Sequence, residues 1–297
     1  MTPRPRVDGG IPDPTAVPGT GSPIFRRVRD LSAEAVLLVG AILMMMPFLW
    51  MVSTALKGPT EIVVWPPSLI PESPTLANFE QVFTTAPFGR WLLNSLVLAV
   101  TSTVAILATS AIAGYVLAKF TFPGRGALFM VILATAIVPF EVYMIPLYLA
   151  ARDLGVIDSL PGVIMPFLIM SFGIFFVRQN VIAAIPDELI EAGRIDGASE
   201  LWIFGRVVVP LLGGPMSALG IFAFMQAWNQ FVWPLLVANS KSLYTAEVGL
   251  ALFQTGYTIN FGAVSAGSVV SVLPILTVFV ILRRRIIDGV ALSGLKG

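Results

Sequence analysis

The chain has 297 residues, of which 56% are hydrophobic and only 12% are charged, and its mean hydropathy is +0.87. A soluble domain carries about 25% charged residues, so much of the surface of this chain must face lipid. The net charge of +1 gives no reason to expect a nucleic-acid partner. Because Cys and His are absent, disulfides, thiolate nucleophiles and imidazole bases are excluded, and zinc loses its commonest ligands.

Apolar runs long enough to cross a bilayer occur six times along the chain. A transmembrane helix needs roughly 20 predominantly apolar residues. Pro215 follows two glycines and suits the first turn of the fifth helix. Residues 248–263, before the last helix, are expected to form a loop. The expected fold class is therefore an all-α membrane protein with six transmembrane helices, at residues 35–56, 91–118, 126–151, 159–177, about 215–240 and about 264–282.

The positions of Lys and Arg predict which ends of these helices face the cytoplasm. Cytoplasmic loops carry an excess of both residues. With the N-terminus inside, fourteen of the eighteen lie on the cytoplasmic side, so we expect a multi-pass protein with both termini in the cytoplasm. Residues 1–30 are predicted to be a disordered cytoplasmic extension, and residues 31–297 the six-helix domain, with a cytoplasmic loop at 178–206. The four Lys and Arg residues expected on the outer side are Lys57, Arg90, Arg152 and Lys241.

The loop between the fourth and fifth helices is long and polar. Pro186 suits a first helical position, and Asp187 and Glu188 follow where the helix dipole favours negative charge. Gly197 suits the residue after a helix, and Ser199 can cap a second short helix. The end of the first helix has little side-chain bulk and suits insertion into the groove of a partner protein. An amphipathic helix lying on lipid headgroups is the alternative interpretation of the same residues.

The spacing of small residues in this loop is distinctive. Glu191-Ala192-Gly193 is followed after three residues by Gly197, and after nine more by Val207, one residue and Val209-Pro210. This segment resembles a motif of the permease subunits of bacterial binding-protein-dependent ATP-binding-cassette (ABC) importers. That motif reads Glu-Ala-Ala, three residues, Gly, nine residues, Ile, one residue, Leu-Pro. Gly193, Val207 and Val209 replace its second Ala, its Ile and its Leu.

Other segments resemble the carbohydrate branch of that family. They are residues 122–125, 145–148 and 227–234, which read Phe-Pro-Gly-Arg, Ile-Pro-Leu-Tyr and Ala-Trp-Asn-Gln-Phe-Val-Trp-Pro. The ending Gly294-Leu295-Lys296-Gly297 is similar to the tail of the smaller permease of maltose importers. The glycerol-phosphate importers have a permease of the same type.

The resemblance implies the type I ABC importer permease fold and a set of partners. These are a second, different permease, two ATPase subunits that bind ATP and Mg, an extracellular substrate-binding protein and membrane lipid in a bacterial cell membrane. This chain itself would hold no cofactor or metal and would have no catalytic site. The tail Gly294, Leu295, Lys296 and Gly297 would contact the ATPase dimer. A coupling helix within residues 186–199 would dock on one ATPase through Glu191, Ala192, Gly193, Asp196, Gly197 and Ala198.

The residues themselves give no sign of an ATP-binding motif in this chain. A phosphate-binding loop needs Gly-x-x-x-x-Gly-Lys followed by Ser or Thr. Lys57, Lys119, Lys241 and Lys296 follow Leu, Ala, Ser and Leu, so none completes that motif. Energy must therefore come from a separate subunit or from an ion gradient.

Five residues within or near the spans are candidates for a substrate path. An acid within a membrane span normally faces the bundle interior or water, so Glu141 is expected to line the path or gate it, or else to make an interhelical hydrogen bond. Asn229, Gln226 and Asn94 can bind sugar hydroxyls, and Trp228 can stack on a sugar ring. The alternative is that the amides join neighbouring helices.

The function expected from these observations is a permease that carries a sugar, or a sugar-like solute, in an ATP-driven importer. An importer of glycerol phosphate or glycerophosphodiesters is the first alternative, although no Lys or Arg lies within the six spans to attract an anion. A proton-coupled secondary transporter that uses Glu141 is a more distant one. A membrane enzyme would need clustered carboxylates, and the acids expected outside show no motif spacing.

Overall fold

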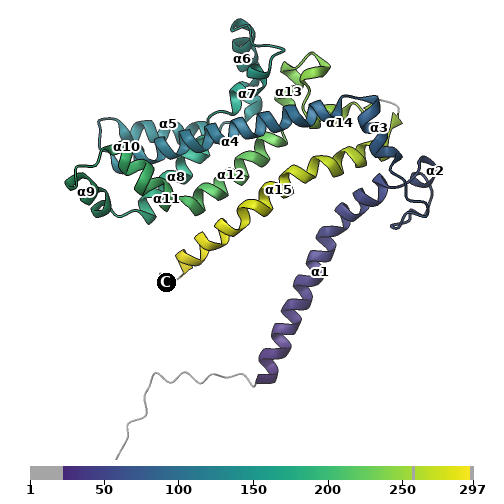
Figure 1. Ribbon diagram of the computed structural model, residues 1–297, viewed down its shortest axis with the longest axis horizontal. Coiled ribbons are helices and arrows are strands. Elements are labelled where there is room, and N and C mark those ends of the chain that lie inside the picture. The colour runs from purple at the N-terminus through teal and green to yellow at the C-terminus, as the bar shows by residue number, and fades with distance from the viewer. Residues whose placement is uncertain (1–22, 256–257, 295–297) are drawn as a thin grey trace, which may run out of the picture. The chain divides into compact units, whose positions relative to one another are not determined.

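The computed structural model describes residues 23–255 and 258–294, which are almost entirely helical (Figure 1). Short 3-10 turns (η1, η3) and a π-helical turn (η2) interrupt the α-helices, and two strands form one small antiparallel sheet. The elements in chain order are α1 (Pro23–Ala55), α2 (Pro59–Ile62), α3 (Ala77–Thr85), α4 (Phe88–Lys119), α5 (Arg125–Ile137), α6 (Phe140–Asp153), α7 (Leu160–Ile164), η1 (Met165–Phe167), α8 (Ser171–Ala184), α9 (Asp187–Ile195), α10 (Glu200–Ile203), η2 (Phe204–Val208), α11 (Val209–Leu211), α12 (Gly213–Trp228), α13 (Val232–Val237), η3 (Lys241–Leu243), α14 (Ala246–Ala251), β1 (Gln254–Thr255), β2 (Thr258–Ile259) and α15 (Phe261–Gly294).

The chain divides into two units, Met1–Trp50 and Met51–Gly297. The first unit contains most of α1, whose apolar side chains between residues 36 and 50 are largely exposed, as expected of a helix that faces lipid or a partner. Because residues 24–32 contain no Gly or Pro, α1 extends back to Pro23, into the segment predicted to be disordered. The remainder of that predicted extension, residues 1–22, lies outside the described residues.

The described part of the chain contains six candidate membrane spans if each of three bent helix pairs is counted as one span. Ala33–Ala55, Phe88–Lys119 and Phe261–Arg283 are each long and apolar enough to cross alone. Three further spans are pairs of shorter helices that meet at a bend of 100°, 42° or 78°. The predicted all-α fold with six transmembrane helices is therefore confirmed. The three bent pairs are Arg125–Ile137 with Phe140–Asp153, Leu160–Phe167 with Ser171–Ala184, and Glu200–Leu211 with Gly213–Val237.

The third span differs from the continuous helix predicted at residues 126–151. It breaks between α5 and α6, where Val138 is extended with a ψ of 118°. Pro139 follows, and a proline disfavours the helical conformation of the residue before it and has no N–H to donate. The fourth span also breaks near a proline, because its bend follows η1, a 3-10 turn that contains Pro166. A search for long runs without charged residues cannot detect either break, because a proline ends the helix but adds no charge to the run.

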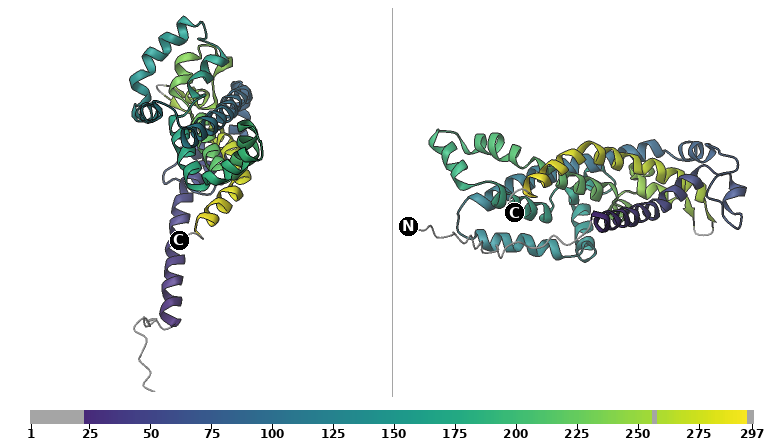
Figure 2. Two further views of the ribbon diagram at one scale, coloured as in Figure 1. Left: turned by 90° about the vertical axis from the view of Figure 1, so that its left-hand side faces the viewer. Right: turned by 90° about the horizontal axis from the view of Figure 1, so that it is seen from below.

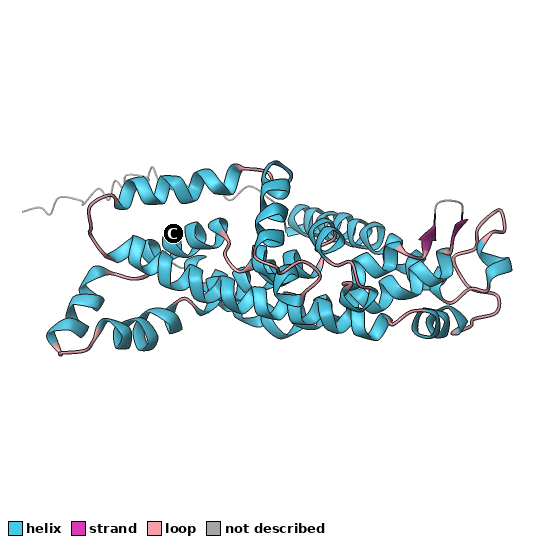
Figure 3. Ribbon diagram, turned by 90° about the horizontal axis from the view of Figure 1, so that it is seen from above, coloured by secondary structure: helices cyan, strands magenta, loops and turns pink. Residues whose placement is uncertain are grey.

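The prediction of a loop at residues 248–263 was wrong, because this segment contains most of α14 and the two strands (Figure 3). The strands have only two residues each, which is too short for an alternating pattern to be visible. Tertiary packing stabilises α14 instead. Val248 and Leu250 are buried, and Gly249 lies so close to Trp91 that a Cβ there would fall 1.9 Å from the indole ring.

The central helix of the second unit is α4, which packs against α8 and α12, while α12 also packs against α15 (Figure 2). Small residues let these helices approach closely, as is usual between membrane helices. A Cβ on Gly114 of α4 would lie 2.8 Å from Val177 of α8, and one on Gly173 would lie 2.4 Å from Ser110. The two regions described next lie at different positions along α4, one beside Ile106 and the other beside Tyr115.

Candidate functional site

The segment from Ile185 to Leu212, named the α9 loop below, folds as its local sequence predicts. Pro186 precedes the first turn of α9, and Gly197 follows the helix with a φ of +78°, which favours glycine. The Ser199 hydroxyl caps α10 by accepting a hydrogen bond from the Trp202 N–H at 3.3 Å. The two predicted helices and the boundary residues Gly197 and Ser199 are therefore confirmed, whereas Pro186 is the residue before α9 and not its first helical position.

A small apolar core lies beneath the α9 loop. Ile190, Ile203 and Val208 are buried there against Tyr115 of α4, together with residues of α8 and α12. Burying an aliphatic side chain contributes roughly 1.5–3 kcal/mol, which is enough to order a short loop helix. Gly193 lies at the closest approach of α9 to α10, since a Cβ there would stand 3.1 Å from the Ile203 side chain. The alanine of the motif would require the Ile203 side chain to shift by a few tenths of an ångström here.

The residues predicted to contact an ATPase lie together at the tip of the α9 loop. Glu191, Ala192, Asp196 and Gly197 are exposed, while Gly193 and Ala198 are half-buried. The sequence did not reveal the large apolar side chains beside them. Ile195 is 86% exposed and Leu201 is 84% exposed, and the Trp202 ring is also exposed. Exposed apolar groups of this size on a polar loop are typical of an interaction surface.

Charged groups tie both ends of α9 to the end of α4. Lys119 donates to the Ile185 carbonyl and to the Asp187 carboxylate, each at 2.5 Å. At the other end, Arg194 Nε donates to Glu200 Oε1 at 2.6 Å, and this hydrogen bond raises the pKa of the Arg194 guanidinium above its ordinary value. The second oxygen of Glu200 accepts from the Tyr115 hydroxyl at 3.2 Å.

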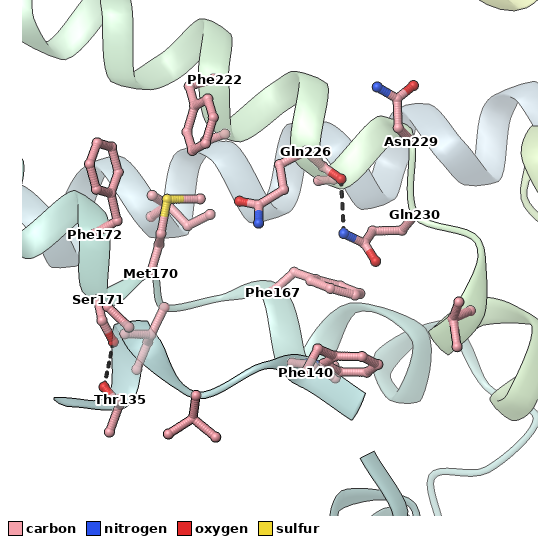
Figure 4. Close-up of a pocket in the computed structure, with 18 of the residues that line it drawn as sticks. Thr135, Phe140, Phe167, Met170, Ser171, Phe172, Phe222, Gln226, Asn229 and Gln230 are labelled. Atoms are coloured by element: carbon pink, nitrogen blue, oxygen red, sulfur yellow. Dashed lines mark hydrogen bonds between the residues drawn. The ribbon is translucent and has the colours of Figure 1, made fainter. Parts of the chain in front are cut away.

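A pocket of about 560 Å³ lies where the spans of the second unit are interrupted (Figure 4). Its walls come from the α5–α6 break, the segment between η1 and α8, and the end of α12 with the residues that lead into α13. This volume is within the range of about 300–1,000 Å³ found for small-molecule sites. The aromatic side chains that line it are Phe140, Tyr143, Phe167, Phe172, Phe222 and Phe231.

Polar groups are few in this pocket and come from different elements. Gln226 reaches from α12 towards Met170, and the Gln230 side-chain amide donates to the backbone carbonyl of Gln226 at 3.0 Å (Figure 4). Thr135 and Ser171 share a hydrogen bond of 2.8 Å across the ends of α5 and α8. Glu141, the second residue of α6, supplies the one carboxylate, and no Lys or Arg is among the described residues that line the cavity.

Three of the five predicted substrate-path residues line this pocket, namely Glu141, Gln226 and Asn229. They do not all point inward, because the Asn229 carboxamide is directed away from Gln226 and Phe167 (Figure 4). The amide at residue 229 follows the last turn of α12, where the backbone leaves the helix and turns the side chain outward.

The other two predicted path residues, Trp228 and Asn94, do not line the pocket. Trp228 is 1% exposed and stacks on Phe224 at 5.7 Å, on the side of α12 that faces the bundle core. Asn94 donates to the carbonyls of Ser242 and Tyr244, at 2.8 and 3.0 Å. Both residues therefore have structural roles in this part of the chain. Residue type alone identified them, as an amide and an indole suited to a sugar, and residue type does not give the face on which a side chain lies.

Sequence reasoning missed Gln230 and the phenylalanines of the pocket. Phe140 and Phe167 stand beside the prolines at the helix breaks, at positions 139 and 166, so the prolines were the available signal. No group of three acidic residues suited to a metal ion occurs within the described residues. Of the predicted ATPase-contacting tail, Gly294 ends α15, and Leu295, Lys296 and Gly297 lie outside the described residues.

Comparison with protein families gives a match over most of the chain. Residues 110–291 match the family described as "Binding-protein-dependent transport system inner membrane component". The matched region contains the α9 loop and every wall of the pocket except Ile106.

Individual relatives match nearly end to end. An arabinooligosaccharides transport system permease protein of Halalkalibacterium halodurans is 34% identical over 86% of this chain and 93% of its own length. A sulfoquinovosyl glycerol transport system permease protein of Agrobacterium fabrum is 31% identical over 94% and 98%. An sn-glycerol-3-phosphate transport system permease protein of Yersinia enterocolitica is 30% identical over 89% and 96%.

A solved structure shares the fold. It is a chain of a bacterial ABC transporter involved in the import of the acidic polysaccharide alginate, with a TM-score of 0.77. The match covers 87% of this chain and 96% of that one at 21% identity. At this identity the similarity establishes the architecture of the bundle, and the chemistry must be argued from the residues of the site.

Proposed function

The chain belongs to the family of binding-protein-dependent transport system inner membrane components, and on that premise we propose that it is the permease subunit of a sugar importer. The solute would be a neutral sugar or a short oligosaccharide that passes through the pocket at the helix breaks. ATP hydrolysis on partner ATPases would drive transport through the α9 loop. No catalytic step is assigned to this chain, and ATP and Mg would be bound by the ATPases.

The composition of the pocket is the observation that carries the proposed substrate. Aromatic faces can pack against the apolar face of a sugar ring, and amides such as those of Gln226 and Gln230 can exchange hydrogen bonds with hydroxyl groups. The Glu141 carboxylate accepts hydrogen bonds from hydroxyls but repels a phosphate or sulfonate. A neutral solute therefore suits this lining better than the anionic solutes named for two of the relatives.

The proposed orientation follows from the excess of Lys and Arg at one side of the spans. Positive charge concentrates in cytoplasmic loops, which favours cytoplasmic termini and a cytoplasmic α9 loop in a bacterial inner membrane. The exposed side chains of Ile195, Leu201 and Trp202 would enter an apolar groove of an ATPase. The acids Glu188, Glu191 and Asp196 around them would meet basic residues at the rim of that groove.

The family description names a binding-protein-dependent system, so an extracellular binding protein would deliver the solute. A second permease would close the open side of the pocket, and the tail that begins at Gly294 would meet the ATPase dimer. When ATP draws the ATPases together, the α9 loop would move with its groove and turn the bundle outward. Release of the solute to the cytoplasm would follow hydrolysis.

Co-purification from native membranes in mild detergent, followed by mass spectrometry, tests this assembly. The expected result is recovery of an ATPase, a second permease and a binding protein. The binding protein would then be screened against neutral oligosaccharides, sn-glycerol 3-phosphate and glycerophosphodiesters. Selective binding of a neutral sugar supports the proposal, whereas selective binding of a phosphorylated solute contradicts the proposed substrate but leaves the ATP-driven mechanism standing.

A further inference from the structure

The helix α4 makes polar contacts with other segments of the chain near both of its ends. At the α9 loop, its Tyr115 hydroxyl donates to Glu200, and Lys119 holds Ile185 and Asp187. The Lys119 side chain is only 7% exposed, so its position is fixed by the surrounding structure.

The other end of α4 is bound to the segment of residues 241–246, between α13 and α14. Trp91 Nε1 donates to the Lys241 carbonyl at 2.7 Å, and Arg90 Nε donates to the Ser242 carbonyl at 3.0 Å. Asn94 donates to two carbonyls of this segment, and the Ser95 hydroxyl accepts from the Ala246 N–H at 2.9 Å. Four side chains from the first turns of α4 therefore bind the backbone of one short segment.

The shape of α4 distinguishes it from its neighbours. The two helices that join the α9 loop directly, α8 and α12, end at the breaks around the pocket. In contrast, α4 has 32 residues and no internal proline, which gives an unbroken length of about 48 Å at about 1.5 Å per residue. Within the described residues, side chains of α4 bind both the α9 loop and residues 241–246.

We propose that α4 is a rigid rod that carries the movement of the α9 loop past the pocket to residues 241–246, and that Tyr115 and Glu200 are the positioning residues that fasten the rod to the loop. This inference deepens the proposed function and depends on it. It explains why Glu200 binds two partners on different elements: Arg194 holds the end of α9, and Tyr115 belongs to α4.

The exposure of this contact supports a positioning role. The side chains of Arg194 and Glu200 are 44% and 41% exposed, and ion pairs this exposed add little to stability. The packing beneath them, with Ile190 and Ile203 buried, holds the loop together without the pair. Loss of the Glu200 contact should therefore loosen the link between loop and rod while the loop stays folded.

The test uses the whole complex in proteoliposomes and measures ATP hydrolysed per solute transported. The variants are Tyr115→Phe, which removes only a hydroxyl, Glu200→Leu, which removes both acceptor oxygens, and the double variant. Tyr148→Phe is the matched control, because no hydrogen bond of the Tyr148 hydroxyl is seen in the described structure and the ring packs in another cluster. A hydrogen bond changes an equilibrium by a factor of about 3–10, so each single variant should raise the ratio about threefold or more.

Because the Tyr115 hydroxyl acts through its contact with Glu200, Tyr115→Phe should add nothing once Glu200 is replaced, so the double variant should have the same ratio as Glu200→Leu. The control Tyr148→Phe should match the wild type. Wild-type ratios in both single variants, or effects that multiply in the double variant, would overturn the inference. A wild-type complex that shows no ATP-dependent uptake would instead overturn the proposed function.

A distance measurement tests the rod itself and does not depend on turnover. Because this chain has no Cys, spin labels can be attached to Ile112→Cys on α4 and Leu189→Cys on α9 without removing other thiols of this chain. The expected distance is the same with and without ATP in the otherwise unsubstituted complex, and its distribution widens in Tyr115→Phe. A distance that already changes with ATP in the unsubstituted complex would overturn the inference.

Discussion

The α9 loop and the pocket use their side chains in opposite ways. In the α9 loop, Ile190, Ile203 and Val208 point inward and fill a small core. Around the pocket, the ends of α5, α8 and α12 separate and leave about 560 Å³ between aromatic and amide side chains. A filled core transmits displacement because it deforms little, whereas a cavity between broken helices can change shape to admit and release a solute.

The largest expected effect comes from Gly197→Val, which tests the filled region. A Cβ at Gly197 would meet no atom of this chain within 4 Å, so the strain within the chain comes from its φ of +78°, which costs a non-glycine residue about 1–2 kcal/mol and a β-branched one more. We expect ATP-dependent uptake in proteoliposomes to fall more than tenfold because the tip of the loop changes conformation.

Gly155→Val is the matched control for that substitution. Gly155 also has a positive φ, of +70°, and open space around its Cβ position, but it lies after α6 and far along the chain from the α9 loop. Uptake should be close to that of the wild type once the amount of assembled complex is equal. Equal losses in both variants would mean that backbone strain, and not the loop, causes the effect.

The second prediction separates two amides of the pocket that lie three residues apart. Gln226→Ala removes a group that points into the cavity and should raise the KM for the solute about fivefold, the typical worth of one hydrogen bond. Asn229→Ala should leave KM within about twofold, since the Asn229 side chain points away from Gln226. Uptake measured over a range of solute concentrations decides the matter, and a larger effect at Asn229 would contradict the geometry of the pocket.

The α9 loop and the pocket differ in how far the sequence alone determines them. The positive φ of Gly197 and the cap at Ser199 follow from neighbouring residues, so the motif predicted them correctly. The pocket depends on how far α5, α8 and α12 bend at their breaks, which no local pattern encodes. The structure places Glu141, Gln226 and Asn229 at the pocket, whereas Asn94 and Trp228 lie on other faces of their helices. Contact of any of the five with a solute stays a prediction.

The third prediction concerns Asn94, which joins α4 to residues 241–246. Asn94→Ala removes two hydrogen bonds to that segment and should lower the maximal rate of uptake about threefold without changing KM. Kinetics of the reconstituted complex separate the two parameters. A raised KM with an unchanged rate would show that the original prediction of a substrate contact was right.

The smallest effect is expected at Asp158, which lies between α6 and α7. Its carboxylate accepts from the Ser240 hydroxyl at 2.5 Å and from the N–H groups of Asn239 and Ser240, and these hydrogen bonds lower its pKa, the hydroxyl contributing most. A group with a lowered pKa stabilises the folded state above its ordinary pKa of 3.8 and loses that effect as the pH falls through its folded-state value.

Amide hydrogen exchange at Asn239 and Ser240 reports this contact directly. After correction for the intrinsic rate, protection should be constant between about pH 8 and pH 5 and should decrease only below the ordinary pKa. Asp158→Asn removes the charge and should abolish that dependence. A loss of protection already near neutral pH would mean that a different group controls this loop.

Uptake into proteoliposomes that contain the whole complex is the most direct test of the energy source. It distinguishes transport driven by ATP hydrolysis through the α9 loop from transport driven by proton movement through Glu141. The measurement follows a neutral sugar in the presence of its binding protein, with ATP and with a protonophore. Uptake that requires ATP and is unaffected by the protonophore is the result expected for an ABC importer permease. Uptake that continues without ATP and is abolished by the protonophore would contradict the account and would make Glu141 the group that carries the proton.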